Sequence, residues 1–176
     1  MRIHCYARVY GIAATVCLTL VGGPTAWAAT PSNVDKQFMV AAAKMNMIEA
    51  HEGQMAENQG ATDGVKELGK TLKQDHTQAY QQLQALASKT GVSIPDGINS
   101  AKIAAVEQLQ NLKGAAFDRA FARDEITAHR QAIAEFKREA DRGTDPDVKA
   151  YARQTISVLE KHLSLAEQCA KSGKHT

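Results

Sequence analysis

Three histidines, His76, His129 and His162, stand near the middle of long segments with helical apolar spacing, and a fourth such segment carries Glu49 near its midpoint. Neutral imidazole and carboxylate groups are ligands for first-row transition metals. If the four segments pack as antiparallel helices, their midpoints lie at similar heights, and one polar residue from each converges on a buried point. The pattern predicts a metal site for Zn, Cu or Fe.

Other acidic residues lie close enough in sequence to support such a site. Glu125 precedes His129 by four residues, so the two share one face of a helix. Asp75 and Glu52 are near neighbours of His76 and Glu49. We expect Asp75 and Glu125 either to add a ligand or to hold a ligating imidazole in place by a hydrogen bond from outside the coordination sphere.

The spacing argues against a standard di-iron ferroxidase. Such bundles place a glutamate three residues before each ligating histidine, whereas Lys73, Ile126 and Leu159 occupy those positions here. A structural alternative also stays open, because a buried histidine that is hydrogen-bonded to Asp75, Glu49 or a backbone carbonyl needs no metal.

Four methionines gather in the segment that carries Glu49, namely Met39, Met45, Met47 and Met55. Methionine fills irregular gaps in a core, and this is the favoured interpretation. The alternative is a soft thioether site for Cu(I) or silver.

Composition excludes several function classes. The chain has 176 residues with a net charge of +2 and no basic tract, which argues against nucleic acid as a partner. It contains no G-x-S-x-G and no H-E-x-x-H. Residues 64–71 match the letters of the P-loop pattern G-x-x-x-x-G-K-T, but they lie in a segment with helical apolar spacing and do not form a phosphate-binding glycine loop. Hydrolase and nucleotide-binding functions therefore have no motif to support them. We therefore assign no catalytic residues and expect a binding protein rather than an enzyme.

Residues 1–28 have the pattern of an export signal. Arg2 and Arg8 precede an apolar run from Val9 to Val21, which is too short to span a membrane, and the signal ends at an A-x-A site at residues 26–28. Cleavage after Ala28 predicts a periplasmic or secreted protein without a membrane span.

The mature chain, residues 29–176, would carry 19 basic and 19 acidic residues, because cleavage of the signal removes Arg2 and Arg8. It would retain a single cysteine, Cys169, which excludes an intramolecular disulfide. The apolar spacing around Cys169 favours a buried thiol, with intermolecular pairing as the alternative.

Periods of three and four residues predict an all-α fold. The sequence predicts long helices over 34–58, 63–90 and 115–142, and a last helix that starts at Pro146 and has its apolar stripe reach Cys169. A short helix over 99–112 occupies the middle connection. Capping patterns support these bounds, notably Ser32 with Asp35, Gly91, and Asp145 before Pro146.

Short loops make the first two long helices one antiparallel pair and the last two another, so the predicted architecture is an antiparallel four-helix bundle over 29–170, followed by a polar tail over 171–176. No internal repeat is strong enough to argue for duplication.

The ordered motifs from Asp35 to Cys169 resemble the DUF4142 family of exported bacterial proteins. The matching pieces are Phe38 with Ala41-Ala42, Met47-Ile48-Glu49, Val65-Lys66, Asp75-His76, Gly91-Val92 with Pro95, Gly114-Ala115-Ala116-Phe117-Asp118, His129 with Phe136, Asp145-Pro146, Lys149-Ala150-Tyr151-Ala152, and Leu159-Glu160-Lys161-His162-Leu163.

The resemblance implies a ferritin-like four-helix bundle and an exported protein. It also implies a carboxylate in the first helix and a histidine in each of the other long helices, which match Glu49, His76, His129 and His162. The family's second Asp-His pair is altered here, since Ala128 precedes His129.

Three functions follow as hypotheses. The first is a metal-binding bundle for storage, buffering or stress protection. The alternative is a noncatalytic envelope or stress-response module with structural histidines, whose partner is an envelope protein or a cell-wall component. The third is an oxidase that uses a bound transition metal.

Overall fold

A computed structural model describes residues 30–98, 106 and 108–173 of the chain. Its long helices are α1 (Asn33–Gln59), α2 (Asp63–Thr90), α4 (Gly114–Arg142) and α5 (Pro146–Ser172). The predicted all-α class is confirmed. The predicted signal at 1–28 and most of the predicted helix at 99–112 lie outside the described residues, although residues 106 and 108–110 are helical.

Local sequence sets the helix ends much as the capping patterns predict. Ser32 and Asp35 form the reciprocal capping box of α1, and Asp145 accepts hydrogen bonds from the first turn of α5. Gly91 ends α2 in the left-handed conformation at φ 69°, which glycine adopts without a steric penalty. α5 continues through Ser172, two residues into the segment that the sequence pattern suggested as a polar tail.

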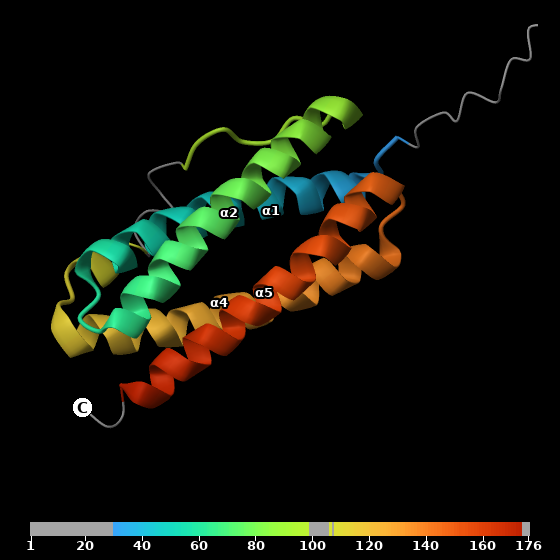
Figure 1. The fold of residues 1–176 in the computed structure, drawn as a ribbon. Helices are drawn as coiled ribbons and strands as arrows, with labels where there is room; N and C mark the ends of the chain where they lie inside the picture. Colours follow the sequence, from blue (N-terminus) through green and yellow to red (C-terminus); the bar gives the residue numbers. More distant parts are fainter. Residues whose placement is uncertain (1–29, 99–105, 107, 174–176) are drawn as a thin grey trace, which may run out of the picture.

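The helices form two antiparallel hairpins, α1–α2 and α4–α5, that pack against each other (Figure 1). Lys89, near the end of α2, pairs with Asp147 at the start of α5, whereas Lys113, just before α4, donates to Gln59 at the end of α1. The α2–α4 connection therefore runs from one end of the bundle to the other. This long crossover is the connectivity of ferritin-like bundles.

Buried carboxylates hold the hairpins together at both ends. Near the start of α1, Asp35 accepts hydrogen bonds from the backbone N–H and hydroxyl of Thr144 in the α4–α5 turn. Near the start of α4, Asp118 accepts from Ala61 N and from both donors of Thr62 in the α1–α2 turn. Each hairpin thus anchors the turn of the other through charge-assisted hydrogen bonds.

The interior has two apolar cores separated by a polar layer. One core gathers Phe38, Leu83, Phe136 and Leu159, and the other gathers Leu68, Leu72, Phe117 and Phe121. Met39 lies in the first core, while Met45 and Met55 pack against the first and the second respectively, in agreement with the core-packing interpretation of the methionines. The segments between the cores carry the candidate site residues on all four helices.

The ionisation of Glu139, which lies beside Asp35, makes the free energy of unfolding depend on pH. Burial raises the pKa of Asp35, but the hydrogen bonds from Thr144 outweigh this and lower it below its ordinary value. Burial and then the adjacent Asp35 carboxyl raise the pKa of Glu139 from 4.5 to about 7. At a pH between the ordinary pKa of Glu139 and its raised pKa, the folded chain holds a proton that the unfolded chain has released. The free energy of unfolding therefore falls as pH rises through this range.

Glu139→Gln is expected to remove that dependence, since the amide stays neutral and still offers a donor to Asp35. The difference in unfolding free energy, variant minus wild type, should grow in favour of the variant from pH 5 to pH 8. Urea unfolding at several pH values measures it. A difference that does not change with pH contradicts the assignment.

Candidate metal centre

His76, His129 and His162 come together from α2, α4 and α5, and each is at most 1% exposed. His129 Nε2 lies 3.3 Å from His162 Nδ1, and the three ring centroids are 5.1–5.7 Å apart. One ring nitrogen from each histidine lies within 4.8 Å of the others. The expected convergence of mid-helix histidines is therefore present in the fold.

Each imidazole uses its other nitrogen for an oxygen outside the cluster. His76 Nδ1 lies 2.9 Å from Asn46 Oδ1, His129 Nδ1 lies 3.0 Å from the Glu125 backbone oxygen, and His162 Nε2 lies 2.9 Å from Asp75 Oδ2. Carbonyl and carboxylate oxygens only accept, so these ring nitrogens must be the donors. Oxygen acceptors of this kind fix the tautomer of metal-ligating histidines.

The orientation of the Asn46 amide is fixed by its own partners. Asn46 Nδ2 donates to the Tyr151 hydroxyl at 3.0 Å, and that hydroxyl donates to the Ala79 backbone oxygen at 3.3 Å. The amide oxygen of Asn46 therefore faces His76. Neither Asn46 nor Tyr151 was among the predicted site residues.

In neutral rings the inward nitrogens His76 Nε2, His129 Nε2 and His162 Nδ1 carry the lone pairs, and His129 Nε2 and His162 Nδ1 lie within hydrogen-bond distance of each other. His76 Nε2 is buried without a hydrogen-bond partner. Burial, followed by the neighbouring histidines, lowers the pKa of His76 well below its ordinary value, and burial lowers the pKa of His162 to about 4 despite Asp75. At neutral pH these two rings carry no extra proton, and the cluster presents nitrogen lone pairs to one point. Such a donor set fits Zn, Cu or Fe.

Glu49 lies beside the histidine cluster rather than in it. One ligand atom each from Glu49, Glu125 and His129 lies within 4.8 Å of the others, and Glu125 Oε2 is 3.3 Å from His129 Nδ1. The α1 residue that contacts His76 is Asn46, one turn before Glu49. His129 is the residue that both groups share.

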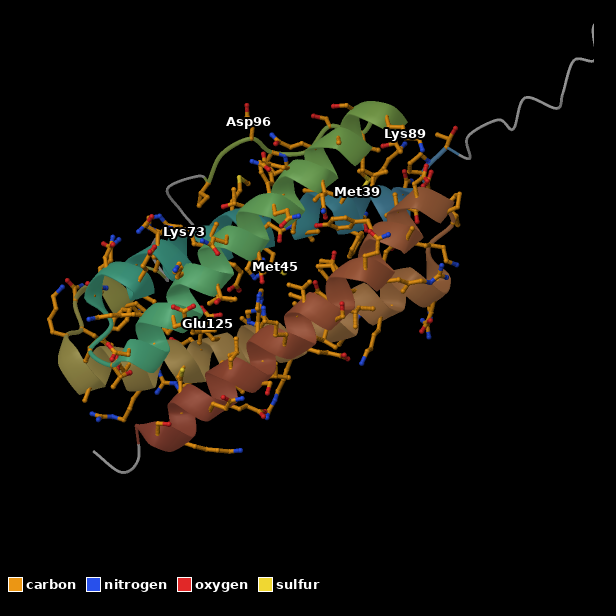
Figure 2. The ribbon with its side chains drawn as sticks, viewed as in Figure 1. Met39, Met45, Lys73, Lys89, Asp96 and Glu125 are labelled. Carbon is orange, nitrogen blue, oxygen red and sulfur yellow. The ribbon has the colours of Figure 1, made fainter. Side chains whose placement is uncertain are left out.

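The carboxyls of this second group are buried and favour the protonated state. Burial, and next Glu125, raises the pKa of Glu49 well above its ordinary value. Burial and then Glu52 raise the pKa of Glu125 to about 8, and burial raises the pKa of Glu52 to a similar value. Figure 2 shows Glu125 between the two hairpins.

A groove of about 630 Å³ between α1 and α4 leads to this group, because Glu49 is among the residues that line it. Met45 and Ile48 line the groove as well, although both side chains are apolar. Ala128 also lines it. An aspartate at position 128 would therefore lie along the groove, and the ring of His129 is oriented by the Glu125 carbonyl instead.

Asp75 contacts a histidine ring, but the ring belongs to a different helix. It accepts from His162 on α5 rather than from His76, its neighbour in sequence. Adjacent residues on a helix point about 100° apart, so Asp75 faces α5 while His76 faces the bundle axis. Lys161 lies 3.9 Å from the same carboxylate oxygen.

None of the helices in the described part of the chain combines the length and hydropathy that a transmembrane span requires. No curated protein matches the chain. The crystal structure of a DUF305 fragment from Deinococcus radiodurans is similar in fold, with a TM-score of 0.72 at 17% identity, over 82% of this chain and 99% of that one. The family model described as "Domain of unknown function (DUF4142)" matches residues 22–169. The chain belongs to the DUF4142 family, as its ordered motifs suggested.

Proposed function

We propose that this protein is an exported four-helix bundle that binds one first-row transition metal ion through His76, His129 and His162. The observation that carries the proposal is the convergence of three buried ring nitrogens, each on a ring whose other nitrogen has an oxygen partner. Asn46, Glu125 and Asp75 each hold a proton on the outer side of a ring, which leaves three inward lone pairs. His76 Nε2 has no hydrogen-bond partner, and an unpaired buried acceptor is costly unless something binds it.

A bound cation would relieve that cost directly. Three imidazole nitrogens would leave a fourth position of a tetrahedral ion for water or another ligand. The ring positions are fixed by hydrogen bonds from three different helices, so the site is organised before the ion arrives. Burial of all three rings favours retention of the ion, which suits storage or buffering in the cell envelope. Export itself is proposed from the sequence of residues 1–28 alone.

Competition with a chromophoric chelator tests the proposal on mature, untagged protein stripped of metal. The expected result is one equivalent of Zn²⁺ or Cu²⁺ per chain, bound with submicromolar affinity. His76→Ala or His162→Ala should weaken binding at least 100-fold. His51→Ala is the matched control, because His51 is exposed on α1 and should leave affinity unchanged. Equal affinity in all of these variants, or no binding by the wild type, contradicts the proposal and favours structural histidines.

Asp75 should affect the metal without binding it. Asp75→Ala removes the acceptor that holds the His162 tautomer, and we expect a 10- to 100-fold loss of metal affinity. Asp75→Asn keeps an acceptor oxygen and loses only the charge, so its loss should be smaller. The same chelator competition measures both. Equal affinities for Asp75→Ala and wild type would show that the Asp75–His162 contact does not support the site.

A further inference from the structure

Three glutamates in and beside the polar layer lack the cationic partner that buried carboxylates ordinarily have. Glu49 and Glu125 are 4% and 2% exposed, and Glu52 is partly buried one turn from Glu49. Among the described residues, no lysine or arginine lies within ion-pair distance of any of the three. Buried carboxylates usually require an ion pair or a metal.

Most oxygens of Glu49 and Glu125 have no N–H donor. Both carboxyl oxygens of Glu125 and one of Glu49 are buried with no hydrogen-bond partner. His129 Nδ1 lies 3.3 Å from Glu125 Oε2, but it makes its hydrogen bond with the Glu125 backbone oxygen. The carboxyls therefore offer several free oxygen ligands at one place.

This group is distinct from the histidine cluster. His129 directs Nε2 towards His162 and Nδ1 towards Glu125, so its ring separates a nitrogen-rich side from an oxygen-rich side. No carboxylate oxygen joins His76 and His162 in a possible ligand set within the described residues. The groove between α1 and α4 reaches the oxygen-rich side through Glu49.

We propose that Glu49 and Glu125 hold a second cation beside His129, with Glu52 at the edge of the site. A divalent cation would displace the protons that these buried carboxyls hold. Two carboxylates with water from the groove then form the oxygen-rich set that hard ions such as Mn²⁺ and Mg²⁺ prefer, whereas the histidine cluster suits Zn or Cu. This site goes beyond the proposed function and does not depend on a loaded histidine cluster.

A titration of the full mature chain with Mn²⁺ tests the second site, with free Mn²⁺ followed by electron paramagnetic resonance. The protein is used both metal-free and after loading with one equivalent of Zn²⁺. We expect one Mn²⁺ per chain in both forms. Glu49→Gln and Glu125→Gln should each weaken Mn²⁺ binding at least tenfold and leave one equivalent of Zn²⁺ bound. These substitutions keep the size of the side chain and remove only its ability to ionise, and circular dichroism and thermal melting confirm that the variants fold.

Glu135→Gln is the matched control, because Glu135 lines the same groove but belongs to neither ligand set. It should bind Mn²⁺ like the wild type. Absence of Mn²⁺ binding in the wild type overturns the second site and leaves the Zn²⁺ result standing. Equal loss of Mn²⁺ in Glu135→Gln indicates attraction by the surface charge of the groove, which also overturns it. Loss of Zn²⁺ together with Mn²⁺ in Glu125→Gln would show that both ions share one centre, which overturns a separate second site.

Discussion

Zinc added to the metal-free protein is expected to raise the free energy of unfolding by about 2.7 kcal/mol when free zinc is 100-fold above its dissociation constant. Only the folded chain brings His76, His129 and His162 together, so binding energy becomes folding energy. For a domain of this size, the gain corresponds to a rise in melting temperature of roughly 5–10 °C. Differential scanning calorimetry with and without chelator measures it.

The His129→Ala variant should show almost none of this shift, because it removes one of the three inward nitrogens. His51→Ala should show all of it, since its side chain is exposed on α1. A shift of the same size in both variants would mean that zinc stabilises the protein from another part of its surface. That result would contradict stabilisation through the three histidines.

Gly69→Ala is expected to cost about 3 kcal/mol or more, the upper end for an overpacked position. A Cβ at Gly69 would lie 2.6 Å from Glu57 N and 2.7 Å from Gly53 O, both backbone atoms of α1. Backbone cannot turn aside as a flexible side chain does, so α1 and α2 must move apart. α1 carries Asn46 and α2 carries His76, and their 2.9 Å hydrogen bond depends on this close approach.

Gly64→Ala is the matched control on the same helix. Its Cβ would meet only Cys169 Sγ at 3.7 Å, an ordinary contact. Alanine exceeds glycine in helix propensity by up to about 1 kcal/mol, so this variant should equal or exceed the wild type in stability. Urea unfolding compares the two variants. Similar stability of Gly64→Ala and Gly69→Ala would contradict the close packing of α1 on α2.

The sequence predicts the helices well because their signals are local. The starts of α1 and α5 are marked by capping residues, Ser32 with Asp35 and Asp145 before Pro146. Their hydrogen bonds are made within the first turn and need no distant partner. The sequence predicts less about how each helix is rotated about its own axis, because that rotation depends on the side chains that the neighbouring helices present. Met45 and Ile48 are more apolar than Asn46, yet Asn46 is the fully buried one and the other two line a groove.

The histidines were predictable for a related reason. They stand at apolar positions of α2, α4 and α5, and the matched depths follow from helices of similar length, 27–29 residues, that run the length of the bundle. The partners of their outer nitrogens were not predictable, because they depend on contacts between helices. Asn46 reaches His76 across 30 residues of sequence, and Asp75 reaches His162 across 87. A stripe through Met39, Ala43, Asn46 and Gly53 was the available signal for Asn46, since these residues recur at helical spacing.

X-ray absorption at the zinc edge of the one-equivalent complex tests the central claim most directly. Binding by the three histidines predicts imidazole scattering with three nitrogen ligands at 2.0–2.1 Å, the normal zinc–nitrogen distance, and loss of one imidazole in His162→Ala. A first shell made mainly of oxygen, or one that does not change in His162→Ala, would contradict binding by the three histidines.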